Sequence, residues 1–455
     1  MSSKIQKMKL QGMTAFVLIW IGQVFSLMGS AMTHFGLGIW AWEKTGQATP
    51  LALVGFFGFA PMILITPIAG VLVDRWNRKL VMALSDIATA LSSLFILIML
   101  SMGKLEMWHL YATSMFAGIF GAFQWPAYSA AISLMIPKKQ YGHASGMISM
   151  AETGSGILAP ILAATLIGKI GLTGIIIVDL VTLVFGLLML VIVSIPALNK
   201  AELTKESREN FLNELAFGFK YLFERASLLG IQLSFFFVNF FSSIAFSLLT
   251  PMILARSNNN VTLLGSINSV GAIGGLTGSL ILTAWGGPKK KILGVLGSWF
   301  VTGFFGLFLF GISGFHILWF IALFLLYLAV PMGNGCNQAI WQAKVAPEVQ
   351  GRVFSVRRLV AQITAPISML IAGPLADKVM EPAMQNSNST LARWLGPIFG
   401  LGPGVGMSIL IALAGLLTAS VVVFAYFIPM IRNVNNLLPD HYAVTDADSY
   451  QKRAY

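Results

Sequence analysis

The sequence predicts an all-α membrane protein whose twelve spanning helices form two bundles of six. Three observations predict this class: long apolar runs, a scarcity of charge, and basic residues concentrated in alternate connecting segments. The chain has 455 residues, of which 56% are apolar and 10% charged, whereas soluble domains carry roughly 25% charged residues. A chain of this composition has too little polar surface to cover a water-soluble globule.

The apolar residues occur in blocks long enough to cross a bilayer, which takes about 20 apolar residues as a helix. Leu51–Val73 and Met407–Met430, for example, contain no charged residue. The first block begins near Thr14, is too long for a signal peptide and lacks a small-residue cleavage site, so we expect it to be the first span. The predicted spans are residues 14–40, 49–73, 79–102, 107–136, 143–168, 171–195, 228–254, 261–285, 291–313, 315–342, 353–377 and 403–431.

Lysines and arginines orient these spans. With twelve spans both termini lie on one side, and 23 of the 29 basic residues fall in segments on that side. Basic residues are in excess on the cytoplasmic side of membrane proteins, so we predict cytoplasmic termini and a multi-pass protein of the cell membrane. The net charge of +12 is then an orientation signal, and nucleic acid is not an expected partner.

The longest polar stretch divides the chain into two halves. Residues 197–226 carry mixed charge with apolar residues at helical spacing in their second part, which predicts a cytoplasmic linker ending in a helix on the membrane surface. The linker separates an N-terminal six-helix bundle, 1–196, from a C-terminal one, 227–432. A cytoplasmic tail, 433–455, follows.

The two halves resemble each other weakly. Gly70–Lys79 closes the second span, and Gly278–Lys291 closes the eighth with a similar glycine-rich, basic turn. Parallel half-repeats with a substrate site between them are a common transporter plan. The alternative is that such turns recur in any polytopic protein.

The turn after the second span, GVLVDRWNRK, resembles the loop signature of the major facilitator superfamily, G-x-L-[AV]-D-R-x-G-R-[KR]. Asn77 stands where glycine is usual, and asparagine tolerates a left-handed turn better than most residues. The resemblance implies a conformational latch on the cytoplasmic face; a plain basic anchor is the alternative. The latch residues would be Gly70, Asp74, Arg75, Arg78 and Lys79.

Three further segments narrow the resemblance to one branch of this superfamily. They are Trp20–Gln23, Phe123–Ala127 and Pro347–Ser355. Together they resemble the macrolide-efflux branch of the drug:proton antiporters. The resemblance implies export of a small amphipathic molecule, driven by protons, by a monomer in a bacterial inner membrane. Uptake, or lipid flipping by the same architecture, remains open.

Ionisable residues within a bilayer are costly and therefore candidates for function. Glu152 lies about nine residues into the fifth span, near mid-depth at 1.5 Å per residue, and is the first candidate for proton coupling. Asp179 and His34 are further candidates. A hydrogen-bonded packing role is the alternative for Glu152 and His34, and a helix-end or gating role is the alternative for Asp179.

Other charged residues lie near the cytoplasmic side of the predicted spans. Asp86, one to two turns into the third span, is expected to pair with the basic residues of the latch. Arg357 and Arg358 begin the eleventh span and either pair with Asp74 or reach lipid head groups.

Uncharged polar and aromatic residues within the spans are candidates for the substrate cavity, because amphipathic ligands suit apolar pockets with a few polar groups. These candidates are Gln23, Trp125, Asn239, Asn334, Asn337, Gln338 and Trp341.

The outer segment 378–402 either caps the outer vestibule or lies on the membrane surface.

Enzymatic function is not expected. The sequence has no nucleophile motif, no histidine–carboxylate cluster with metal spacing and no phosphate-binding loop, so a membrane-embedded enzyme is a remote alternative. The single cysteine, Cys336, excludes an intrachain disulfide and a cysteine-based metal cluster. We therefore expect neither cofactor nor metal.

Overall fold

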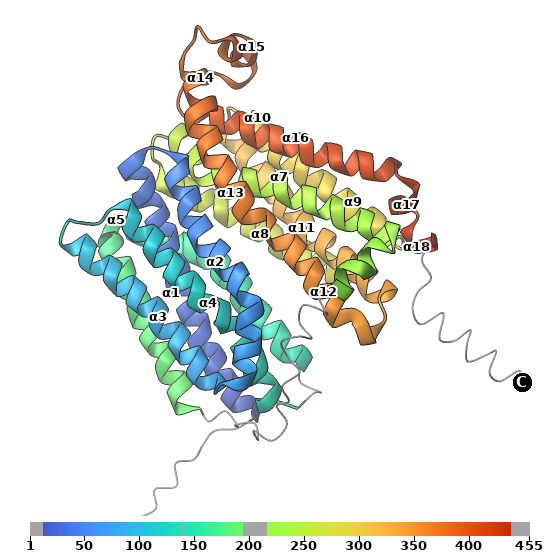
Figure 1. Cartoon of the computed structure of the whole chain (residues 1–455). Helices are drawn as coiled ribbons and strands as arrows, with labels where there is room; N and C mark the ends of the chain where they lie inside the picture. The colour runs from blue at the N-terminus through green and yellow to red at the C-terminus, as the bar shows by residue number, and fades with distance from the viewer. Residues whose placement is uncertain (1–11, 138–140, 194–215, 438–455) are drawn as a thin grey trace, which may run out of the picture. The chain divides into compact units, whose positions relative to one another are not determined.

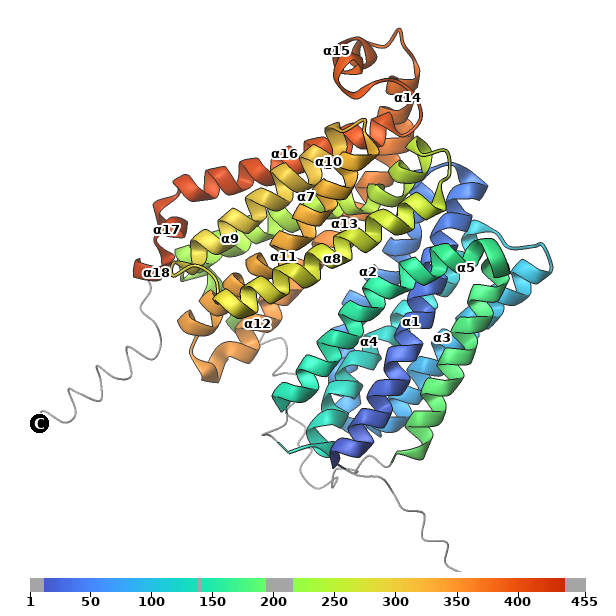
Figure 2. The same ribbon diagram turned by 180° about the vertical axis from the view of Figure 1, so that it is seen from behind.

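Long helices joined by short turns make up nearly all of the described chain, and the residues described contain no strand. The computed structural model describes residues 12–137, 141–193 and 216–437. They form two compact units: unit 1 holds residues 12–45 and 53–193, and unit 2 holds 46–52 and 216–437. Each unit is a bundle of long helices (Figures 1 and 2).

Unit 1 contains the first five long helices, and α2 begins in unit 2. These helices are α1 (Gly12–Thr45), α2 (Ala48–Arg75), α3 (Arg78–Ser101), α4 (Met107–Met135) and α5 (Tyr141–Ile192). The last of them has two arms, because Gly171 interrupts it with φ 66° and ψ 179°, a conformation open mainly to glycine. The arms correspond to the predicted fifth and sixth spans, and Figure 2 shows the bend between them.

Small residues bring α1 against the second arm of α5. Gly22, Gly29 and Gly36 recur at seven-residue spacing, about two turns, and therefore share one face of α1. A Cβ added to Gly22 would lie 3.1 Å from Cα of Gly186, and one added to Gly29 would lie 2.9 Å from Cα of Asp179. Only glycine allows the two backbones this separation.

Unit 2 contains the remaining helices and two segments of wider, π-type turns. These elements are α7 (Ala226–Arg256), α8 (Val261–Trp285), α9 (Lys291–Phe300), η3 (Val301–Phe308), α10 (Leu309–Ile312), α11 (His316–Lys344), α12 (Pro347–Gln362), α13 (Thr364–Leu375), η4 (Ala376–Met380), α14 (Glu381–Gln385), α15 (Thr390–Phe399), α16 (Val405–Phe427), α17 (Pro429–Arg432) and α18 (Val434–Leu437).

Hydropathy and exposure identify the bundles as membrane-spanning. Among the described residues, ten helices are long and apolar enough to cross a membrane, and one of these candidates, Met150–Ile192, runs across the break in α5. Large apolar side chains are nevertheless exposed, including Leu64 at 73%, Leu280 at 70% and Phe424 at 70%. Surfaces of this kind suit contact with lipid tails.

The turn at Asn77 differs from the expectation. Asn77 has φ −67° and ψ 110°, which is extended rather than left-handed, and its side chain accepts a hydrogen bond from the backbone N–H of Lys79 at 3.0 Å. Asparagine therefore acts here as the N-cap of α3. The explanation offered from the sequence, that asparagine replaces glycine here because it tolerates a left-handed turn, is therefore wrong.

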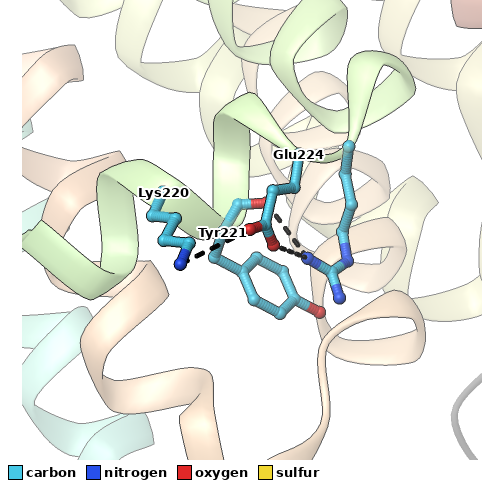
Figure 3. A network of polar contacts seen from close by, with 4 residues as sticks. Lys220, Tyr221 and Glu224 are labelled. Atoms are coloured by element: carbon cyan, nitrogen blue, oxygen red, sulfur yellow. Dashed lines mark hydrogen bonds and ion pairs between the residues drawn. The ribbon is translucent and has the colours of Figure 1, made fainter.

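The described end of the predicted linker is helical and packs on unit 2. Residues 216–223 form a helix, Leu222 is buried in a cluster with Trp341 and Val353, and Phe223 is 69% exposed. Figure 3 shows Glu224 beside Lys220, with N–O separation 4.0 Å. This pair lies within one segment and is exposed, so it contributes little stability, and the segment is held to α11 and α12 by the buried Leu222. Residues 197–215 of the linker lie outside the described residues.

Candidate functional site

The first polar cluster of unit 1 surrounds the carboxylate of Asp86 on α3. Gln124 on α4 donates to Oδ1 at 2.9 Å, and Gln23 on α1 approaches Oδ2 at 3.5 Å, the upper limit for a hydrogen bond. The amide of Gln124 also lies 3.4 Å from Oε1 of Gln23. Asp86 is only 7% exposed. Its described hydrogen-bond partners are thus neutral amides, whereas the sequence placed Asp86 with the basic residues of the latch.

The second cluster surrounds Asp179 on the second arm of α5, which is fully buried. The hydroxyl of Ser30 on α1 donates to Oδ1 at 2.9 Å, and that of Ser93 on α3 donates to Oδ2 at 2.8 Å. His34, one turn beyond Ser30, lies near enough to interact electrostatically with Asp179, although its ring is exposed. The buried carboxylate therefore joins three helices.

Both polar clusters use residues of α1 and α3, and these residues have the same spacing in the two helices. Gln23 and Ser30 are seven residues apart on α1, and Asp86 and Ser93 are seven residues apart on α3. Seven residues correspond to about 10 Å along a helix. The carboxylates of Asp86 and Asp179 therefore form a column between α1 and α3, which we call the carboxylate column.

Glu152, the first candidate from sequence, does not belong to the carboxylate column. Its side chain is exposed on the first arm of α5. It lies near enough to Tyr128 on α4 to interact electrostatically. Asp86 and Asp179 are the buried carboxylates of unit 1 among the described residues, and proton coupling by Glu152 stays a prediction.

A cavity of about 290 Å³ lies within unit 2, lined by three aromatic or apolar residues, one amide and two arginines. Its lining residues are Phe235, Gln338, Phe354, Arg357, Arg358 and Ala361. They come from α7, α11 and α12. We call it the arginine pocket.

Arg357 is fixed in this pocket by α11. Its Nη1 donates to Oε1 of Gln338 at 2.8 Å, and its guanidinium lies 5.2 Å from the ring centre of Trp341. Trp341 is fully buried and donates from Nε1 to Oδ1 of Asn337 at 3.0 Å. The structure therefore joins three predicted cavity residues, Asn337, Gln338 and Trp341, to Arg357.

The four other predicted cavity residues do not line the arginine pocket. Gln23 lies beside Asp86 in unit 1. Trp125 is 43% exposed on α4 of unit 1. Asn239 donates to the carbonyl of Phe235 within its own helix at 2.8 Å. Asn334 is exposed on α11.

The part of the predicted latch that is described serves as a helix cap. Lys79 donates from Nζ to the carbonyls of Val191 and Val193, at 2.8 and 2.6 Å, where α5 ends. A cation at this position complements the negative end of a helix. The Nε of Arg78 is buried and has no hydrogen-bond partner among the described side chains. The side chains of Asp74 and Arg75 are not described, so the latch remains a prediction for these two residues and for Gly70.

The segment 378–402, which the sequence predicts to lie outside, is anchored to the start of α16 through Glu381. Glu381 is 8% exposed and accepts hydrogen bonds from the backbone N–H groups of Gly404 and Met407, at 3.0 and 2.8 Å. Beyond it, Trp394 on α15 is 78% exposed.

No group of three or more His, Cys, Asp or Glu side chains within the described part of the chain is placed to hold a metal ion.

Comparison with known proteins agrees with this architecture. The sequence model of the Major Facilitator Superfamily matches residues 19–369. Macrolide efflux protein A of Streptococcus pyogenes is 30% identical over 368 residues, covering 80% of this chain and 90% of that protein. A protein of the same name from Enterococcus faecalis is 29% identical over 328 residues, covering 71% of this chain and 100% of the relative.

Solved structures show the same fold. A bacterial homologue of the human lysosomal transporter Spinster, inward-facing and unoccupied, has a TM-score of 0.65 at 14% identity and covers 92% of this chain and 98% of its own. A bacterial homologue of the iron transporter ferroportin, inward-facing, has a TM-score of 0.65 at 15% identity, with coverage of 90% and 98%. With the helical bundles and their apolar surfaces, the match of the superfamily's sequence model to residues 19–369 establishes that the chain belongs to the major facilitator superfamily of membrane transporters.

Proposed function

We propose that the protein exports a small amphipathic molecule in exchange for protons, by alternating access across a bacterial inner membrane with both termini in the cytoplasm. It works as a monomer, because each six-helix bundle supplies half of the transport path. Two curated relatives named for macrolide efflux support export. The observation that carries proton coupling is the carboxylate column in unit 1.

The carboxylate column suits reversible protonation. Asp86 and Asp179 accept hydrogen bonds from amide and hydroxyl groups, and such neutral partners can serve either the ionised or the protonated carboxyl, because a hydroxyl both donates and accepts. A charge in the apolar bundle is costly, and a proton removes it. Loading and unloading of protons therefore changes the relative free energies of the two access states.

The arginine pocket supplies the features that an amphipathic ligand needs. Phe235 and Phe354 provide apolar surface, and Gln338 and Arg357 provide hydrogen-bonding groups. Binding pockets for small molecules combine apolar walls with a few polar groups in this way. We therefore place part of the substrate path in the arginine pocket.

The test is flux in liposomes containing the purified protein. With an imposed pH gradient, a radiolabelled macrolide should move against the direction of proton flow. Asp86→Asn and Asp179→Asn should each abolish gradient-driven flux while leaving exchange of labelled for unlabelled substrate, because exchange needs no net proton movement. Gradient-driven flux in both variants would refute the coupling assignment, and flux in the same direction as protons would establish uptake instead.

A further inference from the structure

One face of the short helix α15 packs on the rest of unit 2. Leu395 and Phe399 contact a buried cluster that includes Val405, the first residue of α16, and Ala392 beside them is buried. These three residues of α15 are three or four positions apart and therefore share one face of the helix. This contact fixes the orientation of α15.

A neighbouring face of α15 is apolar but exposed. Leu391, Trp394 and Ile398 also follow three- and four-residue spacing, and their exposed fractions are 38%, 78% and 58%. Leu401, just beyond the helix, is 52% exposed. A continuous apolar surface of this kind marks a site of contact.

This exposed face lies at the end of the spanning helices of unit 2. Arg256 donates to the carbonyl of Ser313 at 3.2 Å and lies 3.5 Å from the carbonyl of Phe399, so the turn before α11 is close to the end of α15. Phe315 and Ile317 follow in that turn and at the start of α11, and they are 74% and 69% exposed. Figures 1 and 2 show α15 beyond the end of α16. The helix therefore lies at the level where spanning helices reach the lipid head groups.

The composition of the exposed face favours a lipid surface as its partner. Tryptophan is enriched where hydrocarbon meets head groups, because its ring is apolar and its N–H is polar. Arg393, which is exposed next to Trp394 in the sequence, brings a positive charge that suits lipid phosphates. Four partly exposed side chains offer only a few hundred Å², whereas a stable contact between two copies of a protein buries roughly 800 Å² on each partner.

We propose that α15 is an interfacial anchor, whose residues Leu391, Trp394 and Ile398 insert between lipid head groups and the first part of the acyl chains. The packed face holds the helix to α16, and the exposed face holds it to the bilayer. Of the two roles that the sequence leaves open for the segment 378–402, the inference selects the membrane surface over a cap on the vestibule. It depends neither on the substrate nor on proton coupling.

The test is nitroxide labelling of the full chain in vesicles of phosphatidylethanolamine and phosphatidylglycerol. Cys336 is the only cysteine and is buried, so Cys336→Ala provides the background. Trp394→Cys and Ile398→Cys report on the exposed face. Ser387→Cys is the matched control, because Ser387 is exposed in the turn before α15. If Cys336→Ala does not remain monodisperse, the native cysteine stays and the label signal of the wild type is subtracted.

The measurement is the collision rate of each label with oxygen, which concentrates in the hydrocarbon, relative to that with a polar nickel chelate, which stays in water. This ratio should be several-fold higher at positions 394 and 398 than at 387. Adding Trp394→Asp to the Ile398→Cys chain should lower the ratio at 398 toward the control value, because a carboxylate opposes insertion. Asn386→Asp places the same charge in the turn and should leave the ratio at 398 unchanged.

Equal ratios at all three labelled positions would place α15 in water and overturn the inference. Labels at 394 and 398 that collide with neither reagent would lie in a protein contact, which would also overturn it. Dilution with lipid then separates the two kinds of contact, since only a second copy would dissociate and free the labels. The assay uses no substrate, gradient or flux, so a failure of export or of proton coupling leaves its result intact.

Discussion

The hydroxyl of Ser93 donates a 2.8 Å hydrogen bond to Oδ2 of Asp179, joining α3 to the second arm of α5. The two residues are 86 positions apart in the sequence, so the contact exists only in the folded bundle. On the opposite side Ser30 donates to the other carboxylate oxygen at 2.9 Å. A carboxyl held between helices in this way can transmit a change of protonation to their packing.

Ser93→Ala tests this transmission. Loss of the hydroxyl removes a hydrogen bond to a charged group, worth roughly 1.5–3 kcal/mol, so gradient-driven flux should fall about tenfold or more while the chain still folds. The matched control is Ser92→Ala, since Ser92 is also buried and its described hydrogen bond goes to the Ala88 carbonyl of its own helix, at 3.0 Å. Equal losses in the two variants would contradict a specific role for Ser93.

The two glutamines around Asp86 should differ in importance. Gln124 lies 2.9 Å from the carboxylate and Gln23 lies 3.5 Å from it, and hydrogen bonds weaken at the longer distance. Gln124→Leu should therefore reduce gradient-driven flux more than Gln23→Leu. Initial rates in liposomes with matched protein content measure the difference, and the reverse order would count against the geometry.

Glu152→Gln should retain gradient-driven flux. The side chain is exposed rather than enclosed by hydrogen-bond donors, so its charge is not required for the coupling that we assign to the carboxylate column. The comparison with Asp179→Asn at one pH gradient is the measurement. If Glu152→Gln lost gradient-driven flux but retained exchange, Glu152 would be the proton-coupling residue.

Gly29→Val should destabilise unit 1. A Cβ at Gly29 would meet the Thr182 side chain and lie 2.9 Å from Cα of Asp179, and overpacking of this kind costs about 1–3 kcal/mol. We expect a lower thermal unfolding midpoint in detergent. Gly38→Ala on the same helix is the control, because a Cβ there has no neighbour within 4 Å, and its midpoint should stay equal or rise. A midpoint for Gly29→Val as high as that of the control would contradict the close approach of α1 and α5.

Glu381→Ala should loosen the start of α16 in unit 2. The carboxylate accepts two backbone N–H groups at the start of α16, and loss of such a cap costs about 0.5–2 kcal/mol. Amide hydrogen exchange over residues 404–408 should increase. Unchanged exchange there would show that α16 begins stably without Glu381.

The sequence predicted the helices better than it predicted the site. Apolar run length and the distribution of basic residues are local properties, so the order of the spans could be derived from them. The break at Gly171 was anticipated only as a boundary between spans, and the π-type turns of η3 (Val301–Phe308) were missed, because they have no signature in hydropathy.

The candidate site was only partly predictable, because depth in a span does not reveal which face a residue occupies. Glu152 was ranked first on depth, yet its side chain is exposed, and Asp86 was assigned to a nearby loop rather than to facing amides. Gln124 and Ser93 were not chosen, although the seven-residue spacing shared by Gln23 with Ser30 and Asp86 with Ser93 was a usable signal. Asn337, Gln338 and Trp341 lie together because they share one short segment of a single helix, and their role in substrate binding stays a prediction.

Proton release on substrate binding tests the central claim most directly. Purified protein in weakly buffered detergent, with a soluble pH indicator, should release protons when substrate is added. The reason is that substrate and protons favour different states of the same conformational cycle. We predict that release is reduced in Asp179→Asn or Asp86→Asn and absent when both are changed. Undiminished proton release from the double variant would contradict the account.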